Sequence, residues 1–176
     1  EVELFLPADI GLELHVPEDG QTYAENAVLK ALAFARASGM TALGDDSGLE
    51  VDALGGKPGL YSQRFAPWPN ASDADRRAYL LQQLQGKPPP WTARFRATVA
   101  VATPGGEVRY AVGECEGEII PDERGTNGFG YDPIFLIPIL GRTMAELAMH
   151  EKNRLSHRAR AMMNARPMLL EILGLK

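Results

Sequence analysis

Two adjacent carboxylates, Asp45 and Asp46, stand in the segment GDDSGLEVD at residues 44–52, directly after a short apolar run. Carboxylates this close repel each other, which raises the pKa of one of them unless a cation lies between them. Mg²⁺ prefers oxygen ligands and would remove that cost. The alternative is an Asx-turn, in which Asp46 caps the backbone at Ser47 and Gly48. Taken alone the segment favours the turn, so chemistry at this point needs a second indication.

A second segment, GFGYDPIF at residues 128–135, combines two glycines with two aromatic side chains. The glycines allow positive φ and let the backbone approach a ligand closely. Phe129 and Tyr131 offer flat apolar faces on which a base could stack. The alternative is a tight turn that enters a strand, with both aromatic side chains in the core.

A third segment, EKNRLSHRARA at residues 151–161, places basic side chains at the expected start of a helix. Ser156 is a good N-cap, and a helix N-terminus attracts anions. His157 and Arg158 would lie in the first turn, where cations are unfavourable for the helix itself. A solvated basic patch is the alternative. Together the three segments suit one ligand, a nucleoside triphosphate with a metal ion.

The composition is that of an ordinary globular protein with an acidic balance. The 176 residues include 18 Lys and Arg against 23 Asp and Glu, a net charge of −5, which argues against broad binding of nucleic acid or an anionic membrane. Cys115 is the single cysteine, so no disulfide forms within the chain, and three His add little for a zinc site. We therefore expect a reducing, cytoplasmic environment. No apolar run approaches the roughly 18 residues of a membrane-spanning helix.

Helical spacing of apolar residues and alternating patterns predict an α/β fold with a mixed sheet and no internal repeat. The expected helices are residues 22–38, 72–85, 143–149 and 156–173, the last bent or interrupted by Pro167. The expected strands are residues 2–6, 40–43, 93–102, 107–119 and 134–137. The third and fourth strands flank TPGG and form a hairpin. The strand at 40–43 is expected to end at Gly44-Asp45.

Long blocks of the sequence resemble the inosine triphosphate pyrophosphatase family, in the order that the family has. These blocks are residues 45–62 with Arg64-Phe65, residues 128–135, and Glu151-Lys152 with Ser156-His157-Arg158. The resemblance implies an elongated α/β fold with two lobes around a central substrate cleft, usually as a homodimer. It also implies Mg²⁺-dependent hydrolysis of aberrant purine nucleoside triphosphates (ITP, dITP, XTP) to the monophosphate and pyrophosphate.

The resemblance also implies the roles of individual residues at a triphosphate. Asp46 would be the general base and a magnesium ligand, with Ser47 beside it at the substrate. Lys30 would face the phosphates, and Lys152 would reach the substrate at the cleft. Glu25 is ambiguous, because a capping box with Thr22 explains it without chemistry.

On the nucleoside side, the resemblance implies a pocket wall and a pair of residues that read the base. The wall would consist of Phe129, Gly130, Tyr131 and Asp132. His157 and Arg158 would donate to the 6-keto edge of hypoxanthine or xanthine and leave the amino group of adenine unpaired, which is costly.

Two departures from the family pattern lead to further expectations. Nothing before Val2 supplies the family's first strand and phosphate loop, so we expect one domain over residues 1–176 that lacks them and binds triphosphate less well. At the place of the family's additional acidic metal ligand stands Pro17, and Glu18 next to it is the expected substitute.

Two other functions remain open from the sequence. The chain could be a septum-formation-inhibitor-like nucleotide pyrophosphatase, which should lack the Ser156-His157-Arg158 block. It could also be a nucleotide-binding module without turnover.

Overall fold

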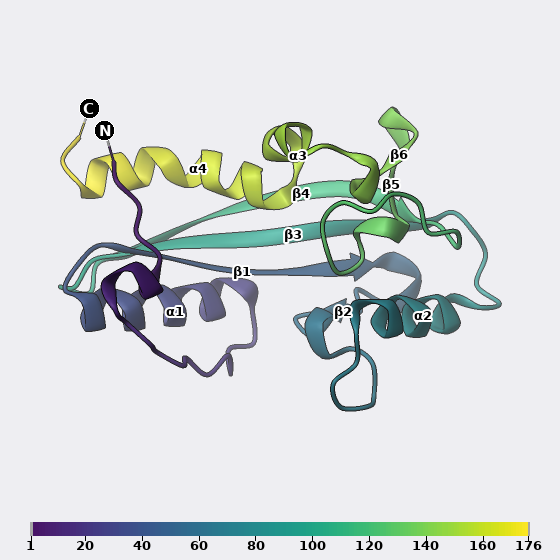
Figure 1. Ribbon diagram of the computed structural model, residues 1–176, viewed down its shortest axis with the longest axis horizontal. Coiled ribbons are helices and arrows are strands. Elements are labelled where there is room, and N and C mark those ends of the chain that lie inside the picture. Colours follow the sequence, from purple (N-terminus) through teal and green to yellow (C-terminus); the bar gives the residue numbers. More distant parts are fainter. Residues whose placement is uncertain (1, 176) are drawn as a thin grey trace. The chain divides into compact units, whose positions relative to one another are not determined.

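A computed structural model describes residues 2–175 and places helices on a single sheet (Figure 1). The helices in this range are α1 (Tyr23–Ser38), α2 (Asp73–Leu84), α3 (Met149–Leu155) and α4 (His157–Ile172). The strands are β1 (Ala42–Val51), β2 (Pro58–Gly59), β3 (Trp91–Ala102), β4 (Val108–Ile119), β5 (Phe135–Ile137) and β6 (Arg142–Thr143). Their order in the sheet is β2-β1-β3-β4-β5-β6. The α/β class expected from the sequence is confirmed.

The strand pairings refine that expectation. The pairs β1–β2, β4–β5 and β5–β6 are antiparallel. The long hairpin of β3 and β4 closes where the Thr103 N–H donates to the Glu107 carbonyl at 2.9 Å. Short turns of this kind suffice to join antiparallel neighbours, whereas parallel strands need a crossover.

The chain folds into two compact units. Unit 1 consists of Glu1–Asp46, Thr98–Ala111 and Ala165–Lys176, and unit 2 of Ser47–Ala97 and Val112–Asn164. Each unit has its own hydrophobic cluster and is described separately below.

In unit 1, α1 packs on the strands through small side chains. Its buried alanines 27, 31 and 35 form a cluster with Ala100 and Ala102 of β3. Gly44 makes the approach of β1 possible, since a Cβ at that position would come within 2.6 Å of the backbone of α1. The helix begins at Thr22, whose hydroxyl accepts the Glu25 N–H, and ends at Gly39 in the left-handed conformation.

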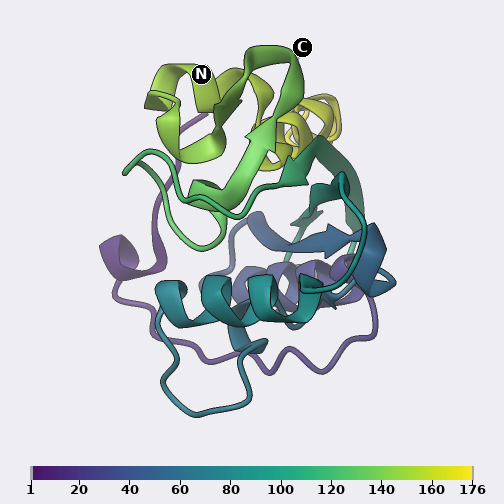
Figure 2. The same ribbon diagram turned by 90° about the vertical axis from the view of Figure 1, so that its right-hand side faces the viewer.

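In unit 2, the core is built from larger side chains. Phe135, Leu49, Leu80 and Leu84 are fully buried in it. α2 begins with a capping box between Ser72 and Asp75 and ends at Leu84, as its sequence pattern predicts. Figure 1 and Figure 2 both show α2 on one side of the strands and α3 on the other.

The expected helices at 22–38, 72–85 and 156–173, the hairpin and the strand at 134–137 are confirmed. Pro167 does not interrupt the last helix, because α4 continues through it to Ile172. The expected strand at 2–6 is wrong, because these residues are irregular and lead into a short 3₁₀ turn at Pro7–Ile10. The expected helix at 143–149 is also wrong. Its capping box of Thr143 and Glu146 supports only one 3₁₀ turn, and Leu147 then returns to the extended conformation. α3 follows as a separate helix that the sequence pattern did not predict.

The strand expected to end at Gly44-Asp45 continues to Val51. Ser47-Gly48 is therefore extended backbone and not a turn. Pairing with β2, in the register Leu49↔Gly59 and Glu50↔Pro58, and the burial of Leu49 and Val51 hold this part of β1 in place. The two carboxylates thus lie in mid-strand, where neighbouring side chains point to opposite faces.

Candidate active site

The first group of polar residues, here called the acidic cluster, consists of Glu18, Asn26, Lys30 and Asp46 in unit 1. Asn26 and Lys30 lie one turn apart on the same face of α1. The Lys30 ammonium is 2.9 Å from Glu18 Oε1 and 3.4 Å from Asp46 Oδ1. One cation therefore lies against both carboxylates that the sequence indicates as metal ligands.

Asn26, which sequence reasoning missed, orients the same carboxylate. It is buried, its Nδ2 donates to Asp46 Oδ2 at 3.0 Å, and its Oδ1 accepts the Gly20 N–H at 2.9 Å. Because one partner is a donor and the other an acceptor, only this orientation of the amide satisfies both. Asn26 thus ties the loop that carries Glu18 to Asp46.

The two neighbouring aspartates differ as strand alternation requires. Asp45 is exposed, whereas the side chain of Asp46 is only 14% exposed and faces Lys30. Burial raises the pKa of Asp46, as does Glu18, and this outweighs the lowering by Asn26 and Lys30. A carboxylate with a raised pKa is a better proton acceptor than an ordinary one. The structure therefore distinguishes the two positions that the sequence left open.

Glu25 lies on the same helix but has a local role. Its carboxylate accepts the Gln21 N–H at 2.6 Å just before the start of α1. This bond makes Glu25 part of the helix cap. The sequence allowed this capping role as the alternative to a role in chemistry.

The second group, here called the aromatic pocket, lies wholly in unit 2. It is a cavity of about 250 Å³. The predicted substrate residues that line it are Ser47, Phe129, Gly130, Tyr131, Asp132, Lys152, His157 and Arg158. Segments as distant in sequence as β1, the loop at 128–132 and the start of α4 therefore meet here. Glu18, Lys30 and Asp46 belong to the acidic cluster in unit 1 instead.

His157 lies stacked in this pocket. Its ring is 4.8 Å from that of Phe95 with an interplanar angle of 15°. Burial lowers the pKa of His157 to about 3, with Arg158 and Lys152 adding to the effect. Within residues 2–175, its buried Nδ1 has no hydrogen-bond partner. The imidazole is thus neutral near pH 7, with one ring nitrogen a donor and the other an acceptor.

The loop at 128–132 presents an aromatic face beside a buried ion pair. Phe129 is 61% exposed, and the Arg158 guanidinium lies 5.5 Å from the centre of its ring. Asp132 is buried, and its Oδ2 accepts from Lys152 Nζ at 2.6 Å and from the Phe129 N–H at 3.2 Å. Burial raises the pKa of Asp132, although Lys152 works against this effect. Asp132 and Lys152, predicted as separate substrate contacts, therefore pair with each other.

Sequence reasoning missed several residues of the pocket. Phe95 was expected only as part of a strand, and Asp73 and Arg76 only as part of a helix, yet all three line the cavity. The charged start of α2, SDADRR at 72–77, was the signal that could have found the last two.

The comparisons with known proteins identify the family. The Ham1 family model matches residues 2–168. The chain belongs to the Ham1 family. It is 51% identical over 155 residues to a dITP/XTP pyrophosphatase of Desulforamulus reducens, covering 88% of this chain and 77% of that protein.

Solved structures of the Ham1 family agree with this membership. The Ham1 protein of Staphylococcus aureus is 41% identical with a TM-score of 0.82, over 89% of this chain and 81% of that one. The nucleoside-triphosphatase, or dITP/XTP pyrophosphatase, of Mycobacterium abscessus is 40% identical with a TM-score of 0.76, over 96% and 86%. The resemblance recognised in the sequence is confirmed. Within residues 2–175, no helix has the length and apolarity that crossing a membrane requires.

Proposed function

We propose that this chain hydrolyses noncanonical purine nucleoside triphosphates, namely dITP, XTP and ITP, to the monophosphate and pyrophosphate, and so cleanses the nucleotide pool. Membership of the Ham1 family and the names of its relatives support the reaction class. They favour it over a septum-formation-inhibitor-like enzyme. A nucleotide-binding module without turnover is the remaining alternative.

The observation that carries the proposal is a neutral His157 next to Arg158 in the aromatic pocket. A purine stacked on Phe129 would present its 6-position to these side chains. A 6-oxo group accepts hydrogen bonds from the Arg158 guanidinium and from a protonated ring nitrogen of His157. Adenine has an amino group there, a donor that cannot accept a hydrogen bond from the guanidinium.

The acidic cluster fits a divalent cation in its chemistry. Its carboxylates supply the hard oxygen donors that Mg²⁺ prefers, and the Lys30 ammonium against both shows that this place accommodates positive charge. Within residues 2–175, no group of three or more His, Cys, Asp or Glu could hold a metal ion by itself. Substrate phosphates and water would therefore complete the coordination of an ion bound by Asp46 and Glu18, a common arrangement for Mg²⁺.

In the proposed reaction, Asp46 takes the proton of a water molecule whose oxygen attacks the α-phosphorus. The bond between that phosphorus and the bridging oxygen breaks, and pyrophosphate leaves with the electron pair. A bound Mg²⁺ would offset the charge of the phosphate oxygens. Asn26 keeps the Asp46 carboxylate in one orientation, and Lys30 contributes positive charge for the phosphates.

The proposal includes a homodimer that acts in the cytoplasm. Both parts rest on the family resemblance. Sedimentation of the purified chain, with a mass of 19.1 kDa per copy, tests the first.

Release of pyrophosphate in the presence of Mg²⁺ tests the function. We expect the rates with ITP, dITP and XTP to exceed that with ATP by at least about 100-fold, because adenine lacks the 6-oxo acceptor. The expected preference over GTP, which also carries a 6-oxo group, rests on the family resemblance alone. Equal rates on all five nucleotides would refute the specificity. Tight binding of ITP without any release of pyrophosphate would instead favour the binding module.

A further inference from the structure

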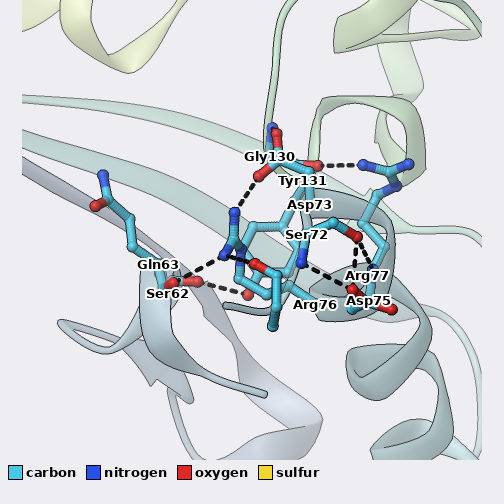
Figure 3. A network of polar contacts seen from close by, with 10 residues as sticks. Ser62, Gln63, Ser72, Asp73, Asp75, Arg76, Arg77, Gly130 and Tyr131 are labelled. Atoms are coloured by element: carbon cyan, nitrogen blue, oxygen red, sulfur yellow. Dashed lines mark hydrogen bonds and ion pairs between the residues drawn. The ribbon is translucent and has the colours of Figure 1, made fainter. Parts of the chain in front are cut away.

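The first turn of α2 holds the loop that carries Phe129. Asp73 Oδ2 accepts the Gly130 N–H at 2.7 Å, and Arg77 Nη1 donates to the Gly130 carbonyl at 2.8 Å. These two groups belong to the two successive peptide units on either side of the Gly130 Cα. Figure 3 shows Arg77 approaching Gly130 directly and Arg76 extending from Asp73 toward the segment of Ser62 and Gln63.

Holding both peptide units fixes the direction of the loop. The backbone angles of Gly130 set the orientation of Phe129 relative to Tyr131, and Gly130 adopts a φ of +61°. A left-handed glycine has many conformations of similar energy, so its peptides need external partners to keep one of them. The two side chains of α2 supply those partners.

Both side chains are themselves held in place. Arg77 forms a two-pronged ion pair with Glu123, at 2.7 and 2.9 Å. Asp73 pairs with Arg76. Burial raises the pKa of Asp73, but the bonds from the Gly130 N–H and Arg76 outweigh it, so its pKa lies below the ordinary value. The carboxylate is therefore ionised and makes charge-assisted hydrogen bonds, which are the stronger kind.

Arg76 also binds the opposite wall of the pocket, which includes Ser62 and Gln63. Its Nη1 donates to the carbonyls of Gln63 at 3.1 Å and Ala71 at 2.6 Å. The Tyr131 hydroxyl reaches the same wall by donating to the Ser62 carbonyl at 2.8 Å. The walls at 62–63 and at 129–131 are thus tied together through α2 and through Tyr131.

We propose that Asp73 and Arg77 are positioning residues of the nucleoside pocket, which fix the face of Phe129 for the base by holding the peptides of Gly130. This inference rests on the proposed function for the identity of the ligand. Asp73 and Arg77 take no part in the reaction, since their polar atoms are used within the protein. Their effect therefore appears in the binding of the nucleoside and not in the chemical step.

A double-mutant cycle on the binding of IMP, measured by calorimetry, tests the proposal. We expect Asp73→Ala to weaken binding about tenfold, the equivalent of one charge-assisted hydrogen bond. In a Phe129→Ala background the same change should cost less than about twofold, because the side chain through which Asp73 acts is gone. Asp73→Asn keeps an acceptor for the Gly130 N–H and should restore most of the affinity.

Asp75→Ala is the matched control. Asp75 caps the same helix through Ser72 and does not line the cavity. Its loss should lower stability without weakening IMP binding. If Asp75→Ala weakened IMP binding as much as Asp73→Ala does, the positioning role would be overturned. It would also be overturned if Asp73→Ala cost the same IMP affinity with Phe129 present as with Phe129→Ala.

The same titration separates the inference from the proposed function. A wild-type chain that binds IMP with this pattern but releases no pyrophosphate from ITP would refute the enzyme and keep the positioning role. Absence of IMP binding by the wild type would overturn both.

Discussion

The acidic cluster and the aromatic pocket differ in how far the charge of their carboxylates is balanced by neighbouring cations. In the cluster, one ammonium at 2.9 and 3.4 Å is shared by two carboxylates. In the pocket, the carboxylates of Asp73 and Asp132 are paired with Arg76 and Lys152. The cluster therefore retains capacity for further positive charge, whereas the carboxylates of the pocket are already neutralised by their partners.

This difference indicates a division of labour. A site that must hold a cation and activate water needs carboxylates whose charge is only partly offset. A site that must read a neutral base benefits from rigid walls, a neutral imidazole and an aromatic face, because their preorganisation lowers the cost of binding. We infer that changes in the cluster affect turnover and that changes in the pocket affect affinity and selectivity.

Asp46→Asn should have the largest effect. Loss of the proton acceptor should lower the rate of pyrophosphate release from ITP roughly 10²–10⁴-fold. Steady-state kinetics with Mg²⁺ measure this. The control is Asp45→Asn, since Asp45 is exposed on the opposite face of β1, and its rate should stay within about threefold of the wild type. Equal losses in both variants would remove the distinction between the two aspartates.

Arg158→Ala should reduce the preference for ITP over ATP. We expect the ratio of the two kcat/KM values to fall roughly 10- to 100-fold, because a donor to the 6-oxo group is lost. Exposed Arg154, on α3, provides a control of equal charge. An unchanged ratio of the two kcat/KM values in Arg158→Ala would mean that Arg158 belongs only to a solvated basic patch.

The pH dependence of stability should report the buried His157. Its pKa is about 3 in the folded chain and near 6.5 when unfolded, so the unfolded state binds more protons between these values. Stability is therefore lost as the pH falls through this window, by about 2 kcal/mol between pH 6.5 and 5 from this group. Urea unfolding of the wild type and of His157→Gln measures the difference. Parallel pH profiles of the two proteins would contradict the neutral, buried imidazole.

Asn26→Ala should slow turnover about tenfold, since one hydrogen bond that orients Asp46 is lost. Asn26→Asp should be worse, because it places a third carboxylate beside Glu18 and Asp46 and removes the donor. The affinity for IMP should change in neither variant. A loss of IMP affinity without a loss of rate would place Asn26 with the pocket and break the division of labour.

Tyr131→Phe should have the smallest effect. It leaves the Ser62 carbonyl without the buried hydroxyl that donates to it at 2.8 Å, at a cost of about 1 kcal/mol in the free energy of unfolding. Tyr110 is 54% exposed, and Tyr110→Phe serves as the control with little expected change. Equal stabilities of the two variants would show that this tie between the pocket walls adds nothing.

The sequence predicts those elements whose signals are local. α1 and α2 begin at the Thr22 and Ser72 caps and end where their periodic patterns end. β1 was predicted too short, because Asp45, Asp46, Ser47 and Gly48 resemble a turn by composition. Its extension depends on pairing with β2 and on the burial of Leu49, which are contacts between distant segments. The Thr143 N–H donates to Glu146 and the Ala148 N–H donates to Glu151, and these bonds mark the starts of two short helical segments whose lengths the local pattern does not determine.

The same limit explains which site residues were found. Motif residues such as Phe129, His157 and Arg158 were predicted to share a pocket, and they line one. Asn26 was missed because its role depends on partners 6 and 20 positions away, Gly20 and Asp46. Asp73 and Arg77 were missed because their partner Gly130 lies more than 50 residues further along the chain. The helix pattern alone accounts for the presence of such residues, and only the tertiary contacts reveal their second role.

The binding of ITP to Asp46→Asn and to Phe129→Ala, measured by calorimetry in the same Mg²⁺-free buffer so that the nucleotide is not turned over, tests the division of labour most directly. We predict that Asp46→Asn binds ITP within about threefold of the wild type, whereas Phe129→Ala binds it at least about tenfold more weakly, through the loss of base stacking. Equal losses of affinity in the two variants would contradict the separation of chemistry from recognition.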